Sequence, residues 1–557
     1  MTLRRRLLPI FLLLVAVTTI ADDAKPTPAA AELAAADQLF QAGKYPEAAD
    51  KYQAILKSEP KLVAAQAGLI RSLLRDEKVE DAFTIASSDI ATEPNAAALR
   101  AAMGDVQFRR GEIRDAEISY LKALELDHSQ VWAYLGLSQL YDAYSLHRQA
   151  YLRLQQAHQL APNDPEVQLD WLDQLPRKER VGALERYLAG PHPDNAEETK
   201  SLQHYLDDLK ANLNKPPHAC KLVSKGEQTD IRMERVLGDD DPPTPVGYAL
   251  VVKLNDHNLK LQLDTGASGI LVGRHAAEKA GLTRISDYRF GGIGDKGLQD
   301  GYLAVAEHIR VGALEFQDCV VGVSDRRSVM GEDGLIGADV FQHYLIDIDM
   351  PEQKLRLSPL PKRPDETEAA PTLNSNGDED ADEESAEPAS SPPKPADSAG
   401  DARPATPRRV PQDRYVAPEM AKWTLVFRFG HALLIPTHVN NSAAMLFLID
   451  TGADGNVISK RAAKQVTKIN LDADSYVQGL SGTVNDVYTA NKVTLHFDHL
   501  DQKNQGITTF DLSTLSADFG TEISGLLGFD TLHLLQIKID YRDGLVDFVY
   551  DAKRWER

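Results

Sequence analysis

The sequence predicts a multidomain protein in which an all-α helical-repeat domain is followed by two similar all-β lobes. Three observations carry this prediction. A 34-residue period runs through the N-terminal part of the chain. Two regions of short strand-like runs follow, and the second repeats motifs of the first at offsets of 186 and then 191 positions. A low-complexity run rich in Pro, Ala, Ser and acidic residues separates these two regions. With 557 residues, the chain is long enough for several domains, each with its own core.

The first residues have the features of a secretory signal peptide. Three consecutive arginines precede the apolar run LLPIFLLLVAV, and Ala21 offers a cleavage point. We therefore expect residues 1–21 to be a signal peptide and residues 22–30 a linker, in an exported protein that is periplasmic or secreted. The apolar run is short for a bilayer and contains Pro9, so we expect membrane attachment only if the signal stays uncleaved.

The net charge and the two cysteines argue against nucleic-acid binding and against a structural zinc site. The net charge of −22, with no basic domain to offset it, argues against a nucleic-acid partner. The two cysteines, Cys220 and Cys319, either form one disulfide in an exported protein or remain free buried thiols. Two cysteines without a histidine at ligand spacing do not make a structural zinc site, so we expect no metal and no cofactor.

Alanine and proline recur at fixed places in the 34-residue period. The alanines are Ala48, Ala82, Ala116 and Ala150, and the prolines are Pro60, Pro94 and Pro162. A small alanine lets two helices approach closely, and a proline ends one helix and begins the next unit. The period and these residues resemble the tetratricopeptide repeat. The resemblance implies helical repeats with a capping helix over residues 31–216. Their concave face would bind a protein partner or present substrate, with a spacer role as the alternative.

The pattern changes near Lys221 from helical to strand-like. Runs such as GYALVVKL and CVVGVSD are typical of strands, and similar runs resume near AKWTLVFRFG. We expect a first all-β lobe over residues 217–358 and a second over residues 419–557. Residues 359–418 between them are acidic and rich in proline, with almost nothing to bury, so we expect a disordered linker.

The two β regions are copies of each other. DTGASGILVGRHAA, which begins at Asp264, aligns without gaps on DTGADGNVISKRAA, which begins at Asp450. Further along, GLIGADVFQHYLIDID aligns on GLLGFDTLHLLQIKID at an offset of 191. Each aspartate follows a strand-like run, KLQL or LFLI, where an isolated buried carboxylate is costly unless it is paired or neutralised.

These matched triplets resemble the aspartic peptidase superfamily of pepsin and the retroviral proteases, and the form around Asp450 is most similar to the retroviral one. The resemblance implies that Asp264 and Asp450 are the two catalytic carboxylates, one from each lobe. Two carboxylates held close together share one proton. The ionised member takes a proton from a bound water while its partner polarises the scissile carbonyl, so no metal or cofactor is needed.

The resemblance also implies supporting roles for the surrounding residues. Crossed hydrogen bonds between Thr265 and Thr451 would lock the two catalytic loops together. Gly266 and Gly452 would let backbone N–H groups approach the carboxylates. Two aliphatic-glycine pairs would pack beneath these loops. They are Ile336 with Gly337 in the first lobe and Leu527 with Gly528 in the second.

Each lobe has one glycine-rich segment between its Asp-Thr-Gly triplet and its aliphatic-glycine pair. By this position they resemble flap hairpins that close over substrate, with glycines Gly291, Gly292, Gly294, Gly479 and Gly482. Gly292, Gly294 and Gly297 also have the spacing of a dinucleotide fingerprint. That interpretation requires a following phosphate-binding helix, whereas the next run, YLAVAEHIRV, is strand-like.

The sequence therefore predicts an exported aspartic endopeptidase whose repeats recruit a partner or substrate. A non-catalytic peptide-binding or scaffold protein, in which the repeats are the working part, is the alternative. Pairing of each lobe with a lobe of another chain also stays open, although the linker is long enough for pairing within one chain. We further expect the repeats, as a unit with its own core, to be dispensable for cleavage of short peptides.

Overall fold

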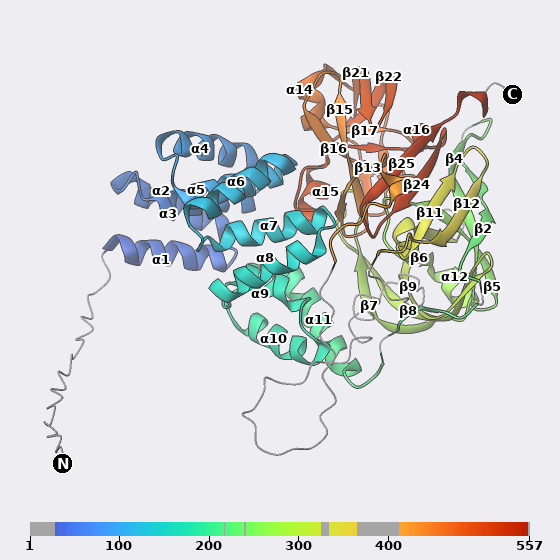
Figure 1. The fold of residues 1–557 in the computed structure, drawn as a ribbon, viewed down its shortest axis with the longest axis horizontal. Helices are drawn as coiled ribbons and strands as arrows, with labels where there is room; N and C mark the ends of the chain where they lie inside the picture. Colours follow the sequence, from blue (N-terminus) through green and yellow to red (C-terminus); the bar gives the residue numbers. More distant parts are fainter. Residues whose placement is uncertain are drawn as a thin grey trace, which may run out of the picture.

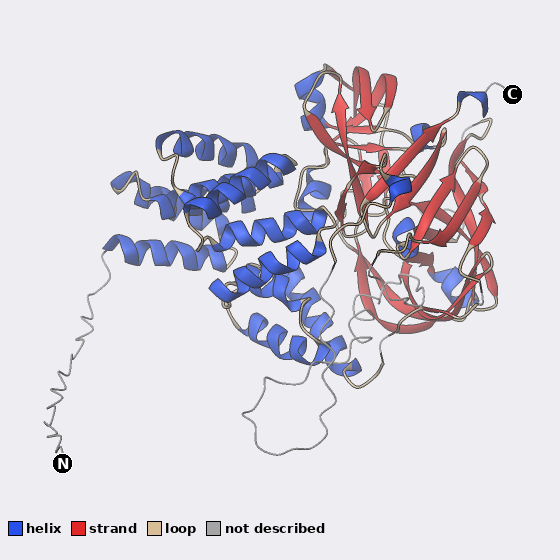
Figure 2. Cartoon of the chain, viewed as in Figure 1, coloured by secondary structure: helices blue, strands red, loops and turns tan. Residues whose placement is uncertain are grey.

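The structure, a computed structural model, describes residues 28–216, 218–224, 226–238, 241–324, 333–364 and 412–554. Helices gather on one side of the molecule and strands on the other (Figures 1 and 2). The expected signal peptide lies outside the described residues, as do residues 22–27 and 365–411 of the two expected linkers. Among the described residues, no helix combines the length and the apolar character that crossing a membrane requires.

The N-terminal domain is a stack of helices, which confirms the expected all-α repeat fold. Its helices are α1 (Pro28–Gln41), α2 (Tyr45–Ser58), α3 (Val63–Arg75), α4 (Val79–Thr92), α5 (Ala97–Arg109), α6 (Ile113–Leu126), α7 (Val131–Ala143), α8 (His147–Leu160), α9 (Pro165–Leu172), α10 (Arg177–Ala189) and α11 (Ala196–Asn212).

Small residues allow these helices to pack closely. The recurring alanines Ala48, Ala82 and Ala116 are fully buried. The ring of Tyr120 lies between α5 and α7, where a Cβ on Gly104 would come within 2.5 Å of the ring and one on Gly136 within 2.2 Å. The 34-residue period therefore places large side chains of one helix against glycine and alanine of its neighbours.

Lobe 1 is built on one large sheet with strand order β1-β9-β6-β10-β5-β4-β8-β7, and β3 pairs with β4. Its elements are β1 (Lys221–Leu222), β2 (Thr229–Arg232), β3 (Glu234–Leu237), β4 (Pro245–Leu254), β5 (His257–Asp264), β6 (Ile270–Gly273), α12 (Arg274–Lys279), β7 (Thr283–Phe290), β8 (Gln299–Val311), β9 (Leu314–Ser324), β10 (Gly334–Gly337), η1 (Ala338–Phe341), β11 (Tyr344–Asp349) and β12 (Lys354–Pro359). Cys220 and Cys319 form a disulfide that ties the start of the lobe to β9.

Lobe 2 repeats this plan with strand order β14-β15-β16-β23-β17-β22-β21-β18, while β19 and β20 pair separately. Its elements are η3 (Pro418–Met420), β13 (Thr424–Leu425), β14 (Phe427–Phe429), β15 (Ala432–Val439), β16 (Ala444–Ile449), β17 (Val457–Ser459), α14 (Lys460–Val466), β18 (Ile469–Leu471), β19 (Val477–Gly479), β20 (Gly482–Val484), β21 (Tyr488–Phe497), β22 (Leu500–Phe510), α15 (Ser513–Asp518), β23 (Gly525–Leu527), α16 (Phe529–Leu532), β24 (Leu535–Asp540), β25 (Leu545–Tyr550) and η4 (Ala552–Arg554).

A sheet shared by both lobes joins them within one chain. Its strand order is β13-β25-β24-β11-β12-β2, so β11 of lobe 1 pairs directly with β24 of lobe 2. The pairing is antiparallel and sets Ile348 opposite Ile537, both fully buried. This continuous hydrogen-bonded sheet brings the two Asp-Thr-Gly loops together within one chain.

The described residues on both sides of the central linker form hydrogen bonds to Asp543, which is fully buried between β24 and β25. Arg363, near the end of lobe 1, donates to Asp543 Oδ1 at 2.5 Å and to Gln412 Oε1 at 3.1 Å. After the linker, the N–H of Tyr415 donates to the same Asp543 oxygen at 2.8 Å, and Arg414 Nε donates to the Asp543 carbonyl at 2.8 Å. The linker therefore leaves and re-enters the fold at one place.

The repeats pack directly on lobe 2. One hydrophobic core contains Tyr134 and Leu137 of α7 together with Leu446 and Leu448 of β16. The rings of Tyr144 and Phe427 lie 5.1 Å apart at its edge. The expectation that the repeats form a unit with its own core holds for the cluster of α1 to α5. It is wrong for α5 to α8, because these helices share a core with lobe 2.

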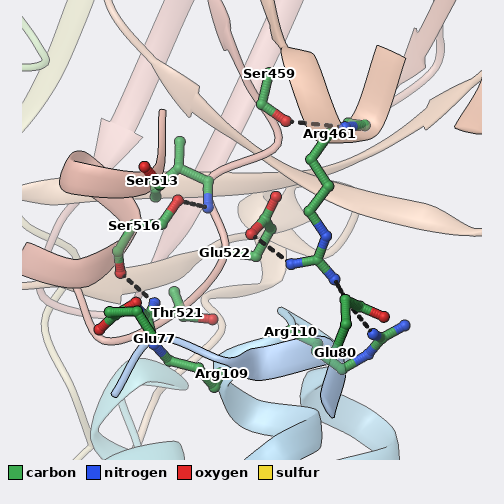
Figure 3. Close-up of polar contacts among 12 residues, drawn as sticks. Glu77, Glu80, Arg109, Arg110, Ser459, Arg461, Ser513, Ser516, Thr521 and Glu522 are labelled. Carbon is green, nitrogen blue, oxygen red and sulfur yellow. Dashed lines mark hydrogen bonds and ion pairs between the residues drawn. The ribbon is translucent and has the colours of Figure 1, made fainter. Parts of the chain in front are cut away.

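Polar contacts border this shared core (Figure 3). Arg109 of α5 donates to the carbonyl of Ser516 at 2.6 Å, and Thr521 Oγ1 donates to the carbonyl of Phe108 at 2.7 Å. Arg461 of α14 pairs with Glu522 at 3.0 Å and also with Glu80 of the repeats. These contacts fix the orientation of the repeats on lobe 2.

Candidate active site

The two Asp-Thr-Gly triplets meet at the boundary of the lobes. Asp264 ends β5 and Asp450 directly follows β16. Thr265 Oγ1 donates to the carbonyl of Ile449 at 2.7 Å, and Thr451 Oγ1 donates to the carbonyl of Leu263 at 3.0 Å. Each threonine is almost completely buried. The threonine side chains thus cross from one lobe to the other and hold the two loops at a fixed separation.

Glycine in each triplet makes room for the opposite aspartate. A Cβ on Gly266 would lie 2.7 Å from Asp450 Cγ, and one on Gly452 would lie 2.3 Å from Asp264 Cγ. The same glycines donate to the aspartate of their own loop, with Gly266 N 2.8 Å from Asp264 Oδ1 and Gly452 N 3.0 Å from Asp450 Oδ1. Each carboxylate therefore lies against the loop of the other lobe, a position that any side chain on the glycine would close.

The aliphatic-glycine pairs lie beside the strands that lead into the two triplets. β10 runs parallel to β5 with Gly337 opposite Asp264, and Ile336 is fully buried. In lobe 2, the N–H of Asp450 donates to the carbonyl of Leu527 at 3.0 Å, and Leu527 is fully buried. A Cβ on Gly528 would lie 2.2 Å from the carbonyl oxygen of Gly455. The backbone after the lobe 2 triplet therefore packs directly against the backbone of Gly528, where a side chain has no room.

Burial dominates the electrostatics of the pair. It raises the pKa of Asp264, against the opposing effects of hydrogen bonds from Gly266 and Asp450 and of the nearby His431. Burial, followed by the charge of Asp264, raises the pKa of Asp450 well above its ordinary value. Because both carboxyls are desolvated and one charge opposes the other, simultaneous ionisation of the two carboxyls is disfavoured.

Two further aspartates brace the chain that follows each triplet. Asp339 accepts hydrogen bonds from Gly269 N at 3.0 Å and Ser268 Oγ at 3.1 Å. Asp530 accepts from Asn456 N at 3.1 Å. The triplet motifs give these two aspartates no role, yet they stand 191 positions apart at the same place in the aligned GLIGAD and GLLGFD segments. The occurrence of an aspartate at the same place in both aligned segments is the sequence signal that predicts their shared role.

The two flap segments meet tip to tip. Ser481 N donates to the Ile293 carbonyl at 3.0 Å, Lys296 N donates to the Ser481 carbonyl at 2.7 Å, and Thr483 N donates to Asp295 Oδ1 at 3.0 Å. Four of the five flap glycines, Gly292, Gly294, Gly479 and Gly482, lie against residues of the opposite segment.

Close approach explains why the flap tips carry glycine. Gly294 and Gly482 have φ angles of +145° and +128°, and a Cβ on Gly294 would lie 2.1 Å from Gly482 N. A Cβ on Gly479 would lie 2.2 Å from the Ile293 carbonyl oxygen, one on Gly292 2.9 Å from the Leu480 side chain, and one on Gly291 3.1 Å from the Leu298 side chain.

A cavity of about 1160 Å³ is lined by residues of the repeats and of lobe 2. Its helical wall includes Arg71, which pairs with Asp105 at 2.7 Å and lies 4.6 Å from the centroid of the Trp132 ring. The lobe 2 wall includes His431 and Phe519. The cavity therefore extends from the repeats to His431, whose Nε2 lies 3.2 Å from the carbonyl oxygen of Gly266 in the loop after Asp264.

The wall of this cavity also contains partly desolvated carboxyls. Burial raises the pKa of Glu166 to about 7 despite the charge of Arg75, and it raises the pKa of Asp170 to about 6. In the described part of the chain, no group of histidine, cysteine and acidic side chains is arranged to hold a metal ion.

A family model described as "Aspartyl protease" matches residues 250–340 and 435–531, one segment in each lobe. UBA domain-containing protein Mud1 of Schizosaccharomyces pombe is 33% identical over 109 residues, which are 19% of this chain and 31% of that protein. DNA damage-inducible protein 1 of Cryptococcus neoformans is 29% identical over 158 residues, which are 26% of this chain and 35% of that protein. The chain spans about a third of the length of these curated relatives.

Solved structures similar to the chain include repeat proteins. A thermophilic TPR protein of Thermus thermophilus has a TM-score of 0.26 and 18% identity, over 33% of this chain and 99% of that chain. The first TPR of Spaghetti, bound to an HSP90 peptide, has a TM-score of 0.19 and 21% identity, over 21% of this chain and 91% of that chain. The two matched segments of the family model each contain one Asp-Thr-Gly triplet, so the similarity of both β lobes to aspartyl proteases includes the two triplets.

Proposed function

We propose that this protein is an exported aspartic endopeptidase that hydrolyses peptide bonds with a water molecule activated by Asp264 and Asp450. One observation carries the proposal: each carboxylate lies against the glycine of the opposite triplet, and crossed threonine hydrogen bonds hold the two loops. A scaffold needs neither two buried carboxyl groups side by side nor a rigid bridge between them, because uncompensated burial of a carboxylate destabilises the fold.

The geometry supports general acid–base chemistry. The ionised carboxylate takes a proton from water, and the protonated one donates a hydrogen bond to the scissile carbonyl. Backbone N–H groups of Gly266, Gly452 and Ala453 fix the carboxylates in place before substrate arrives. Such preorganised donors stabilise charge without reorganisation during the reaction.

The helical repeats recruit a protein partner or the substrate itself. The cavity between the repeats and lobe 2 supports this role, because it has walls from both units and includes His431 next to the catalytic loop of lobe 1. A polypeptide bound in the cavity would be held beside the site of cleavage, which raises its effective concentration there.

Export is part of the proposal. The N-terminal pattern favours a cleaved signal, and the disulfide between Cys220 and Cys319 is typical of proteins that fold in an oxidising compartment. Cell fractionation together with N-terminal sequencing of the mature protein tests this step. We expect the mature chain to begin at Asp22, outside the cytoplasm, whereas an intact N-terminus in the cytoplasm would contradict export.

The activity is tested with a peptide library across pH, with and without a pepstatin-type inhibitor. We expect internal cleavage that the inhibitor blocks and that Asp264→Asn and Asp450→Asn each abolish. The matched control is Asp256→Asn, whose carboxylate is 95% exposed and should be neutral. Peptide binding without cleavage by the wild type would instead identify a non-catalytic peptide-binding protein.

A further inference from the structure

Asn456 is a buried side chain in the loop between the lobe 2 triplet and β17. It is 3% exposed, and its amide group contacts residues of two other segments of the lobe. Its Oδ1 accepts from the N–H of Gly528 at 2.9 Å. Its Nδ2 donates to Thr531 Oγ1 at 2.7 Å and to Gln502 Oε1 at 2.8 Å, with Asn504 Oδ1 at 3.4 Å. Because a backbone N–H only donates, the amide oxygen must face Gly528 and the amide nitrogen must face the other groups.

The contact with Gly528 fixes the peptide unit that holds the backbone of Asp450. The N–H of Gly528 and the carbonyl of Leu527 belong to one planar peptide unit. The N–H of Asp450 donates to that Leu527 carbonyl at 3.0 Å. A hydrogen bond at the N–H of the unit therefore fixes the direction of its carbonyl and strengthens the carbonyl as an acceptor. Asn456 thus acts on the backbone of Asp450 through a single peptide unit.

Three further hydrogen bonds join the loop of the lobe 2 triplet to the segment that follows β23. The N–H of Phe529 donates to the carbonyl of Ala453 at 2.7 Å, and the N–H of Asp530 donates to the carbonyl of Asp454 at 3.0 Å. In the opposite direction, the N–H of Asn456 donates to Asp530 Oδ1 at 3.1 Å. Asn456 therefore contributes both a backbone donor and a side-chain acceptor to the support of this loop.

Lobe 1 makes the equivalent contact with its backbone. Gly337 stands 191 positions before Gly528, and its N–H donates to the carbonyl of Gly269 at 2.7 Å. At the offset of 186, Asn456 corresponds to Ile270, whose side chain has no group that accepts a hydrogen bond. Both lobes thus supply an acceptor for the N–H of this glycine, a backbone carbonyl in lobe 1 and the Asn456 amide in lobe 2. The same contact made by two different groups indicates a requirement of the site rather than of local packing.

We propose that Asn456 is a positioning residue of lobe 2, which holds the backbone of Asp450 in place through the peptide unit of Leu527 and Gly528. The proposal rests on the proposed peptidase activity. Asn456 acts through the backbone and transfers no proton itself, so its contribution to the reaction is the position of Asp450 relative to Asp264. A small displacement of one reacting group lowers the rate of the chemical step more than it weakens substrate binding.

The kinetic test uses two substitutions that separate the acceptor of the amide from its shape. Asn456→Leu keeps the branched shape and loses the acceptor, whereas Asn456→Asp keeps an oxygen that accepts from Gly528. We expect Asn456→Leu to lower kcat by about tenfold, the rate equivalent of one hydrogen bond, with KM nearly unchanged. Asn456→Asp should recover most of kcat, even though a buried carboxyl beside Asp530 lowers its stability. If the leucine variant does not fold, Asn456→Ser replaces it, because the serine hydroxyl ends one atom short of the position of Oδ1.

The matched control is Asn255→Leu in lobe 1. Asn255 Oδ1 also accepts from a backbone N–H, that of His308 at 3.1 Å, and its Nδ2 donates to the Ala280 carbonyl at 2.9 Å. Asn255 precedes β5, whereas Asp264 ends that strand. We expect this variant to lose stability and to keep the wild-type kcat. An unchanged kcat in Asn456→Leu, an equal loss of kcat in the control, or an aspartate variant no better than the leucine one would overturn the proposal.

Hydrogen exchange provides a readout that separates this proposal from the proposed function. Exchange is followed by mass spectrometry on the intact protein without substrate, in peptides that cover residues 444–452 and 258–266. A general loss of stability speeds exchange in both peptides, whereas loss of the support for Asp450 speeds it in residues 444–452. We expect Asn456→Leu to speed exchange about tenfold more in residues 444–452 than in residues 258–266, and Asn255→Leu to show no such preference. Equal increases in Asn456→Leu would overturn the proposal, whereas a wild type that cleaves no peptide would reject only the peptidase.

Discussion

The backbone N–H of Thr265 donates to Thr451 Oγ1 at 3.0 Å, and the backbone N–H of Thr451 donates to Thr265 Oγ1 at the same distance. Each hydroxyl in turn donates to a strand carbonyl of the opposite lobe. The four hydrogen bonds form a closed, buried bridge, so a small movement of either lobe strains all of them. This bridge determines how close the two carboxylates come.

We predict that Thr265→Val and Thr451→Val each destabilise the protein and lower kcat strongly. Each change leaves a buried N–H and a buried carbonyl without a partner, at a cost of about 1–3 kcal/mol per group. Urea unfolding and peptide cleavage measure the two effects. Thr437→Val is the matched control, since Thr437 is fully buried in β15 and only donates within its own strand, to the Ile435 carbonyl at 3.2 Å. Wild-type kcat in Thr265→Val would contradict a role for the bridge in catalysis.

We predict that Asp450→Asn is more stable than the wild type at pH 7. The folded-state pKa of Asp450 is raised well above the ordinary 3.8, so the wild type loses stability as pH rises from that value through the folded pKa. Asparagine does not titrate and escapes this loss. The expected gain is roughly 1–3 kcal/mol, and it should shrink below about pH 4, where the wild-type carboxyl is protonated in both states. Urea unfolding at several pH values measures the difference, and a gain that is constant with pH would contradict the raised pKa.

We predict a bell-shaped pH–rate profile with a mildly acidic optimum. Its two limbs belong to the carboxyl pair and not to either aspartate alone. The residues after the triplets are Ala267 and Ala453, whereas pepsin-like enzymes carry a serine there that donates toward the carboxylates. Without that donor, and with burial raising both pKa values, the acidic limb lies at higher pH than in a gastric enzyme. Steady-state cleavage of one good peptide substrate across pH measures the profile, and maximal turnover near pH 2 would contradict the argument.

We predict that removal of residues 28–212 destabilises the lobes. The sequence alone favours a dispensable repeat domain, but the truncation would uncover Phe427, Leu446 and their neighbours in the core shared with α5 to α8. Each large apolar side chain exposed to water costs about 1–3 kcal/mol. We expect a Tm lowered by about 5 °C or more, or aggregation on size-exclusion chromatography. A monomeric fragment with the Tm of the intact protein would show that the shared core contributes little.

The sequence by itself determined those features of this protein that depend on residues close together in the chain. The 34-residue period predicts the helical stack, because each repeat is one short segment with its own turn and apolar face. The matched frames around Asp264 and Asp450 predict two equivalent lobes, because a strand that ends in the same triplet must place its aspartate in the same way in each copy. The flap segments are also local, since their glycines stand together in the chain.

Tertiary structure alone decided which distant surfaces meet. The disulfide, the pairing of β11 with β24, and the core that joins α7 to β16 all connect segments whose separate patterns are equally compatible with other partners. His431 is the clearest case, because it lies 165 positions from Gly266 in a hairpin with no motif. A hydrogen bond across such a separation depends on how two lobes and a repeat domain pack, and packing complementarity is a property of the assembled surfaces, which no single segment carries.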